Sequence, residues 1–245
     1  MALRFAAEGA NVVIHGTDAT RAQATQRAIA ESGGSASVCL GDVGDDSFGE
    51  ELADRAVRQF GSIDIFVAGA GRISVEPFLE MSATMFRQLL DVHVTGAFTT
   101  SQAAARRMVE AGNGGRILYI ASVAAMHAMF GYAGYCAAKS AVTALTRVAA
   151  LELAVYGITV NAIAPGPVQN EMMEQLWGPD WLRERSRTIP AGRLAQPGDV
   201  ADLAAFLASP AASYITGQTM FLDGGATAAG LYTHEVFKRS DPPEE

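Results

Sequence analysis

Short apolar runs alternate with longer amphipathic stretches along the chain, and this alternation constrains the fold more than any other feature of the sequence. The runs are rich in Val and Ile and are mostly apolar on both faces, which is typical of buried parallel strands. Repeated β-α units of this kind predict a single α/β domain built on a doubly wound parallel sheet. The expected strands are Asn11–His15, Ala36–Leu40, Asp64–Ala68, Arg116–Ala121, Ile158–Ile163 and Thr219–Leu222, and the expected helices are Ala19–Ser32, Ser47–Phe60, Ala83–Ala111, Tyr135–Tyr156 and Pro197–Leu207.

The composition narrows the possible functions. A length of 245 residues suits one domain with a full core, in which about residues 226–245 form a C-terminal tail that ends in the polar stretch Arg239–Glu245. The net charge of -8 argues against nucleic acid, whose phosphates need a basic face. Cys39 and Cys136 are the only cysteines, so a reducing cytoplasm is expected rather than a disulfide framework. No apolar stretch has the length of a membrane span, and the four scattered histidines show no metal-ligand spacing.

The strongest chemical motif combines Ser122 with the run Tyr135-Cys136-Ala137-Ala138-Lys139. A tyrosine and a lysine four positions apart on a helix lie on the same face. Because a nearby ammonium favours the phenolate, Lys139 is expected to lower the pKa of Tyr135 from about 10 toward neutral pH and make it a general acid/base. Taken alone the spacing is a weak signal, since a packed tyrosine beside a solvated lysine gives the same pattern.

The sequence around this motif is more specific. Gly115–Val142 resembles the short-chain dehydrogenase/reductase family, with a strand, Ser122, a loop and then Tyr-x-x-x-Lys opening a helix. Tyr135 follows Ser122 by thirteen positions, which matches the family spacing. Other segments resemble the family in the expected order: Asp42-Val43 the pair at the adenine, Asp64–Gly71 the fourth strand and its loop, Asn161–Val168 the turn at the nicotinamide amide, and Arg193–Gly225 the closing helix and strand.

The resemblance implies a Rossmann-like fold and an NAD(P)-dependent oxidoreductase that interconverts a secondary alcohol and a ketone. It implies that Tyr135 handles the proton, that Ser122 orients the substrate oxygen, and that Lys139 tunes Tyr135 and holds the nicotinamide ribose. The cofactor-binding residues that it implies are Thr17, Asp42, Val43, Ala70, Gly71, Tyr135, Lys139, Pro165, Gly166 and Val168. It also implies a homo-oligomer, a dimer or tetramer, paired through Ala83–Ala111 and Tyr135–Tyr156, whose Ala-rich stretches would let helices approach closely.

The substrate side is marked by apolar residues. Between Ser122 and Tyr135 and after the Pro-Gly turn, the resemblance places the pocket and its lid. The apolar character of these stretches predicts an aliphatic or aromatic alcohol or ketone, although the same residues could pack against a neighbouring subunit. The expected pocket residues are Met126, Met129, Phe130, Met172 and Trp177.

The beginning of the sequence departs from the family. Members begin with a strand and a Thr-Gly-x-x-x-Gly-x-Gly turn that receives the pyrophosphate, whereas Met1–Gly9 resembles the back half of the helix that follows this turn. The expected fold is therefore N-terminally incomplete, either as a shortened sequence or as a natural rearrangement of the sheet. We expect a gap or a direct pairing between the strands that begin near Asn11 and Asp64, and weak or absent dinucleotide binding.

Smaller departures concern the catalytic and ribose positions. His93 replaces the family's catalytic Asn, and a neutral imidazole could hold the relay water of that Asn or could simply fill the site. Ala68-Gly69-Ala70-Gly71 replaces Asn-Asn-Ala-Gly, and Asn170 replaces a Thr near the phosphates. At the position of the acid that would hold the ribose of NAD, the chain has Gly16 followed by Thr17, which favours NADP over NAD by a small margin.

Two other functions remain open from the sequence. A lyase, isomerase or dehydratase could use Tyr135 as a base without a dinucleotide, and the missing glycine turn favours this alternative. A non-catalytic subunit is the third possibility, which the intact Ser122, Tyr135 and Lys139 disfavour. Lys139 and the turn Pro165-Gly166-Pro167-Val168 favour the oxidoreductase, because both serve a nicotinamide.

Overall fold

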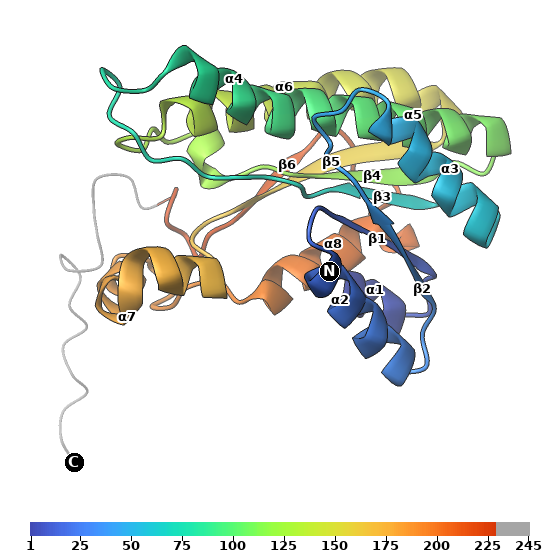
Figure 1. Ribbon diagram of the computed structural model, residues 1–245, viewed down its shortest axis with the longest axis horizontal. Helices are drawn as coiled ribbons and strands as arrows, with labels where there is room; N and C mark the ends of the chain where they lie inside the picture. The colour runs from blue at the N-terminus through green and yellow to red at the C-terminus, as the bar shows by residue number, and fades with distance from the viewer. Residues whose placement is uncertain (229–245) are drawn as a thin grey trace.

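The computed structural model describes residues 1–228, apart from the side chains of Glu171, Met172, Gln175 and Leu176, and has the expected Rossmann-like α/β fold (Figure 1). Its strands are β1 (Val12–Gly16), β2 (Ala36–Leu40), β3 (Ile65–Ala68), β4 (Gly115–Ile120), β5 (Ile158–Pro165) and β6 (Thr219–Leu222). Its helices are α1 (Ala2–Ala7), α2 (Ala19–Glu31), α3 (Phe48–Phe60), α4 (Ala83–Leu90), α5 (Gly96–Ala111), α6 (Ala133–Leu153), α7 (Glu171–Arg187) and α8 (Pro197–Ala208).

The parallel strands form two separate sheets. β1 pairs with β2, and β3, β4, β5 and β6 pair in that order. Within the described residues β1 and β3 each have one strand neighbour, so both present an edge where the two sheets approach each other. The expected defect between these strands is therefore confirmed, and it takes the form of a gap.

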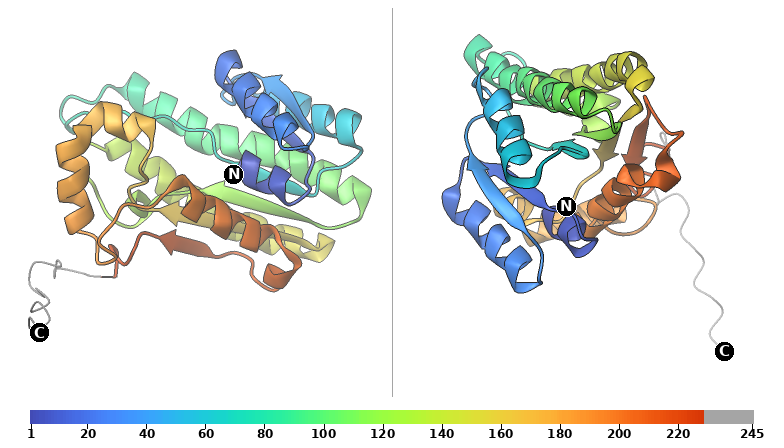
Figure 2. Two further views of the ribbon diagram at one scale, coloured as in Figure 1. Left: turned by 90° about the horizontal axis from the view of Figure 1, so that it is seen from below. Right: turned by 90° about the vertical axis from the view of Figure 1, so that its right-hand side faces the viewer.

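Helices cover both faces of the four-stranded sheet (Figure 1, Figure 2). On one face α3, α5 and α6 pack against β3, β4 and β5 around a core that includes Met108, Tyr119 and Val160. On the other face α8 packs against β4 and β5 around Leu118, Ile163 and Leu207. α1 contacts both α8 and α2, so it links the two sheets on this face.

The structure differs from the sequence prediction in two helices. The predicted helix Ala83–Ala111 is divided into α4 and α5 by one turn of π-helix at Asp91–Thr95, which contains His93. α7 was not predicted. Gly178, with φ of 72°, and Pro179 interrupt it, so the sequence there lacks the regular pattern of one helix.

The Ala-rich stretches lie partly in the core and partly at the surface. Ala103, Ala104, Ala105, Ala138 and Ala150 are buried in the core of this chain, whereas Ala137 is exposed and Ala149 is partly buried. The exposed apolar side of α6 and the turn after it includes Val148, Leu151 and Val155.

Candidate active site

The catalytic candidates meet at the carboxyl ends of β4 and β5. Parallel strands end at one edge of a sheet, and ligands of such folds bind at that edge. Ser122 follows β4 directly, and its Oγ accepts a hydrogen bond of 3.1 Å from the backbone N–H of Ala124. Tyr135 and Lys139 lie in the first turns of α6, which packs against the turn that Ser122 begins. The structure thus brings together Ser122, Tyr135 and Lys139.

Lys139 is buried and held by the end of β4. Its Nζ donates a hydrogen bond of 2.7 Å to the carbonyl oxygen of Ile120 and lies 5.6 Å from the centroid of the Tyr135 ring. The side chain is 5% exposed, and the loss of hydration lowers the pKa of Lys139 to about 8. A lysine in this state exchanges its proton far closer to neutral pH than a surface lysine does.

The expected lowering of the Tyr135 pKa is wrong for this structure. Burial raises the pKa of Tyr135, and the hydrogen bond with the Ser122 hydroxyl only partly opposes this effect. The physical reason is that an apolar environment penalises the phenolate, while the Lys139 ammonium is directed to Ile120. Tyr135 is therefore a neutral phenol, ready to donate a proton.

His93 lies beside Tyr135, with ring centroids 5.3 Å apart and ring planes at 85°. Its Nε2 lies 2.7 Å from the carbonyl oxygen of Arg72 and also accepts a hydrogen bond of 3.2 Å from the backbone N–H of Arg72, so the Arg72 backbone holds this ring nitrogen in either tautomer. Nδ1 is buried and has no partner among the described residues. Burial, with a smaller effect of Lys139, lowers the pKa of His93 to about 4, so the imidazole is neutral. A neutral imidazole with one unpartnered ring nitrogen thus lies next to the tyrosine.

Gly71 makes room for this histidine. A Cβ on Gly71 would lie 2.5 Å from Cε1 of His93, which is closer than real Cβ atoms approach. The glycine expected from the family loop is therefore required here by His93 itself. The Arg72 carbonyl, which fixes the ring, was not identified from the sequence, because a backbone contact leaves no mark on residue identity.

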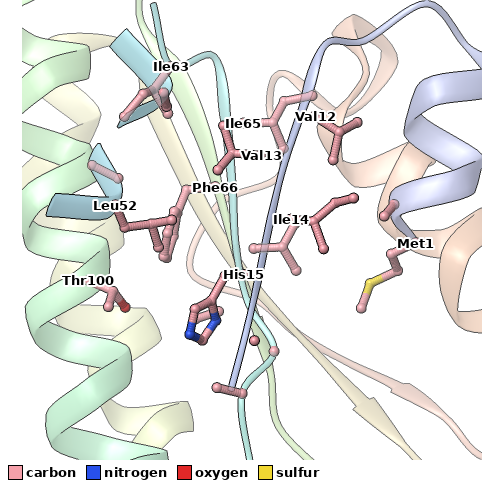
Figure 3. A pocket seen from close by; sticks show the side chains of 18 of the residues that line it. Met1, Val12, Val13, Ile14, His15, Leu52, Ile63, Ile65, Phe66 and Thr100 are labelled. Atoms are coloured by element: carbon pink, nitrogen blue, oxygen red, sulfur yellow. The ribbon is translucent and has the colours of Figure 1, made fainter. Parts of the chain in front are cut away.

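A second group of expected residues lines a cavity between β1 and β3 (Figure 3). The cavity has a volume of about 970 Å³. The cofactor candidates that line it are Thr17, Asp42, Val43, Ala70 and Gly71.

The remaining cofactor candidates lie apart from this cavity. Pro165, Gly166 and Val168 are at the end of β5, where the backbone N–H of Gly166 bonds the Leu222 carbonyl and Val168 bridges to Ala195. They do not line the cavity. The candidates therefore form two groups, one at the end of β5 and one, which includes Gly71, beside the gap.

The expected pocket residues are distributed over two elements. Met126 and Phe130 are exposed, Phe130 at 92%, and Met129 is partly buried. On α7 Trp177 stacks on Trp181 with centroids 5.0 Å apart, whereas Met172 lies outside the described side chains. Met126 and Phe130 therefore lie at the surface of this structure, and the role of the five residues as a substrate pocket stays a prediction.

An apolar pair in the loop before α4 was not predicted from the sequence. The loop before α4 is joined to the residues before α6, because the backbone N–H of Glu76 bonds the Gly131 carbonyl at 2.9 Å. This contact places the loop that carries Phe78 and Leu79, which are 81% and 96% exposed, near the segment of Phe130. The sequence signal that could have identified this pair is the occurrence of two consecutive apolar residues directly after Pro77.

Comparisons with known proteins agree with this geometry. A family model described as enoyl-(acyl carrier protein) reductase matches residues 1–227. The chain is 37% identical over 225 residues to L-rhamnose 1-dehydrogenase (NAD(P)(+)) of Azotobacter vinelandii, covering 90% of this chain and 88% of the relative. It is 39% identical over 229 residues to 3beta-hydroxysteroid dehydrogenase 1 of Eggerthella lenta, covering 93% and 88%.

The fold match is equally extensive. A short-chain type dehydrogenase/reductase from Mycobacterium marinum superposes with a TM-score of 0.87 at 37% identity, covering 92% of this chain and 89% of that one. The chain belongs to the short-chain dehydrogenase/reductase family. The relatives named above are dehydrogenases, and the chain is an enzyme of the oxidoreductase type.

No helix among the described residues is both long and apolar enough to cross a membrane. In the same part of the chain no three His, Cys, Asp or Glu side chains are grouped so that they could hold a metal ion.

The substitution His93→Asn is expected to reduce the loss of stability in acid. The pKa of His93 is about 4 in the folded protein, against 6.5 for a histidine in water, so between these values the unfolded chain binds a proton that the folded protein excludes. The free energy of unfolding contributed by this group therefore falls as the pH drops through this window, by about 2 kcal/mol between pH 7 and pH 4.5.

Denaturant unfolding at both pH values measures the difference. The unmodified protein should lose about 2 kcal/mol more than His93→Asn. Equal losses in the two proteins would show that His93 protonates in the folded state near its ordinary pKa.

Proposed function

We propose that this chain is an NAD(P)-dependent oxidoreductase that interconverts a secondary alcohol and a ketone through Ser122, Tyr135 and Lys139. The observation that carries the proposal is the joint placement of a neutral, partly buried Tyr135, hydrogen-bonded to Ser122, beside a buried lysine whose pKa is about 8. General acid/base catalysis requires groups that donate or accept protons and whose pKa lies near the working pH.

Each residue has a separate task in this proposal. When a ketone is reduced, the Ser122 hydroxyl donates a hydrogen bond to the carbonyl oxygen, and the Tyr135 hydroxyl delivers the proton to it. Lys139 stabilises the negative charge that then develops on Tyr135. His93 offers Nδ1 to a water that returns the proton to this pair, which gives its unpartnered atom a role. The dinucleotide, when bound, supplies or accepts the hydride.

The residues of the structure fit the two ends of such a dinucleotide. Pro165, Gly166 and Val168 adjoin the catalytic end, and the cavity beside Thr17, Asp42 and Val43 has a volume in the range of ligand pockets. The structure fits the phosphates in the middle of the dinucleotide less well. The helix that begins beside Thr17, α2, has its N-terminus capped by the Asp18 carboxylate, which accepts from the Arg21 N–H at 3.1 Å and opposes a phosphate there. Gly16 in place of an acid supports NADP over NAD.

The substrate in this proposal is a neutral, largely apolar alcohol or ketone. The exposed Met126, Phe130, Phe78 and Leu79 give the entrance an apolar rim, which supports such a substrate. The names of two relatives, a rhamnose and a hydroxysteroid dehydrogenase, indicate uncharged hydroxyl substrates for those proteins. The proposed partners are this substrate and further copies of the chain. The proposed location is the cytoplasm.

Tyr135→Phe is expected to lower turnover by about 10²–10⁴-fold, because it removes only the hydroxyl that carries the proton. Tyr132→Phe is the matched control, since Tyr132 lies 6.1 Å from Tyr135 between ring centroids and has no task in the reaction. Turnover is measured at millimolar NADP or NAD with a panel of secondary alcohols. If Tyr135→Phe keeps more than about half of the activity, proton transfer occurs elsewhere.

We also propose a homo-oligomer, a dimer or tetramer, in which the exposed side of α6 is covered. Leu151 and Val155 are 82% and 80% exposed although they are apolar, and Val148 lies on the same side. Light scattering at micromolar concentration should give a multiple of the chain mass, and Leu151→Glu should shift it toward the monomer. Glu152→Gln is the control, because the neighbouring residue is already polar. A monomeric mass for the unmodified chain would refute the proposal.

A further inference from the structure

Two tight turns beside the start of α6 carry large apolar side chains at their central positions. The first turn is Pro77–Glu80 and the second is Met129–Tyr132. The central positions of turns usually carry small or polar residues, because they project into water. Here they carry three apolar side chains that are 81%, 96% and 92% exposed, respectively Phe78, Leu79 and Phe130.

We infer that the two turns bind the far end of a substrate with a long, neutral, apolar body, and that they select such a ketone or secondary alcohol over a short one. The inference rests on the proposed function, because it names the substrate class for the same catalytic site. It adds a binding region that lies beyond the reacting group.

The two turns are fixed by backbone contacts. A hydrogen bond of 2.9 Å closes the first turn and one of 3.1 Å closes the second. A third bond, from the N–H of Glu76 to the Gly131 carbonyl at 2.9 Å, joins them. Gly131 has a φ of 80°, and a Cβ there would lie 3.0 Å from Cγ1 of Val75, so the junction requires glycine. The exposed side chains are therefore held in place without being buried themselves.

The turns lie directly before the catalytic tyrosine. Tyr132 ends the second turn and precedes α6, and its ring centroid is 6.1 Å from that of Tyr135. Met81 follows the first turn, and its Sδ lies 3.5 Å from the position of a Cβ on Gly134. The ends of a tight turn are less than about 7 Å apart, and neighbours on one helix face about 5–6 Å. Phe130 therefore lies roughly 10 Å from Tyr135.

Continuity with the catalytic residues identifies the occupant. Met126, which is 66% exposed, lies in sequence between Ser122 and Phe130, so exposed apolar side chains accompany the chain from the catalytic serine to the second turn. A second protein would need about 800 Å² of surface from each partner, which is far more than the central residues of two turns supply. The charged residues at the first turn, Glu76 and Glu80, are both acidic and disfavour an anionic far end.

The length of the substrate follows from this distance. An extended chain advances about 1.3 Å per bond, so roughly eight carbons span the 10 Å from the reacting carbon to Phe130. Contacts so far from the reacting carbon are the same in the ground state and in the transition state. They should therefore lower KM and leave kcat nearly constant.

Turnover of 2-butanone, 2-hexanone, 2-octanone and 2-decanone at millimolar NADPH or NADH tests the inference. The kcat/KM for 2-decanone should exceed that for 2-butanone by about tenfold or more, through KM. In the double variant Phe78→Ser, Phe130→Ser this ratio should fall by about fivefold or more. Tyr214→Ser is the matched control, because Tyr214 is fully exposed and lies outside both turns, and it should keep the ratio.

Binding of 2-decanone without a dinucleotide, followed by saturation-transfer NMR, separates this inference from the proposed function. The dissociation constant should rise by about fivefold or more in the double variant and stay the same in Tyr214→Ser. Absence of turnover with every ketone would refute the proposed function, while the binding result would still decide the inference.

Three results would overturn the inference. The first is equal binding of 2-decanone to the double variant and to the control, and the second is no binding to the unmodified chain at the solubility limit of the ketone. The third is a smaller mass of the double variant by light scattering with unchanged binding, which would assign the exposed side chains to a contact with a neighbouring copy.

Discussion

One buried hydrogen bond, from Nζ of Lys139 to the carbonyl oxygen of Ile120, fixes the relation between α6 and the end of β4. Ser122 follows Ile120 by two residues, and Tyr135 precedes Lys139 by one helical turn, so this bond sets the distance between the serine and the tyrosine. A buried ammonium needs such a partner, because its hydration is lost. The same burial lowers the pKa of Lys139 to about 8. The constraint that positions the site thus also sets its proton chemistry.

The two sides of the molecule differ in completeness. From β3 to β6 the sheet is continuous, both faces are covered by helices, and the catalytic residues are supported from β4, β5 and α6. On the side of β1 and β2 the sheet is interrupted by the cavity. His93 and Gly71 lie where these sides meet, since Gly71 lines the cavity while His93 contacts Tyr135. The catalytic end is therefore formed independently of the gap, whereas the cofactor-binding end borders on it.

Much of this arrangement was predictable from residue identity. Buried parallel strands consist of apolar runs, so all six strands were located to within two residues of their ends. The proximity of Ser122, Tyr135 and Lys139 was predictable because their spacing is tied to one helix and one strand end, while their catalytic role stays a prediction. The π-helical turn at Asp91–Thr95 was not found, since its residues also suit an ordinary helix. The direction of the Tyr135 pKa was wrong because burial depends on the packing of distant segments. For the same reason the alanines that pack in the core, such as Ala104 and Ala138, were not distinguished from an exposed one such as Ala137.

The central claim is that the catalytic end is complete while the gap between β1 and β3 limits the binding of the dinucleotide. Titration of the 245-residue chain with NADH and with NADPH, followed by fluorescence, tests this claim most directly. The account predicts dissociation constants of about 1 mM or weaker for both, because the pyrophosphate charges meet the Asp18 carboxylate instead of free N–H donors. Micromolar affinity for either dinucleotide would contradict the account.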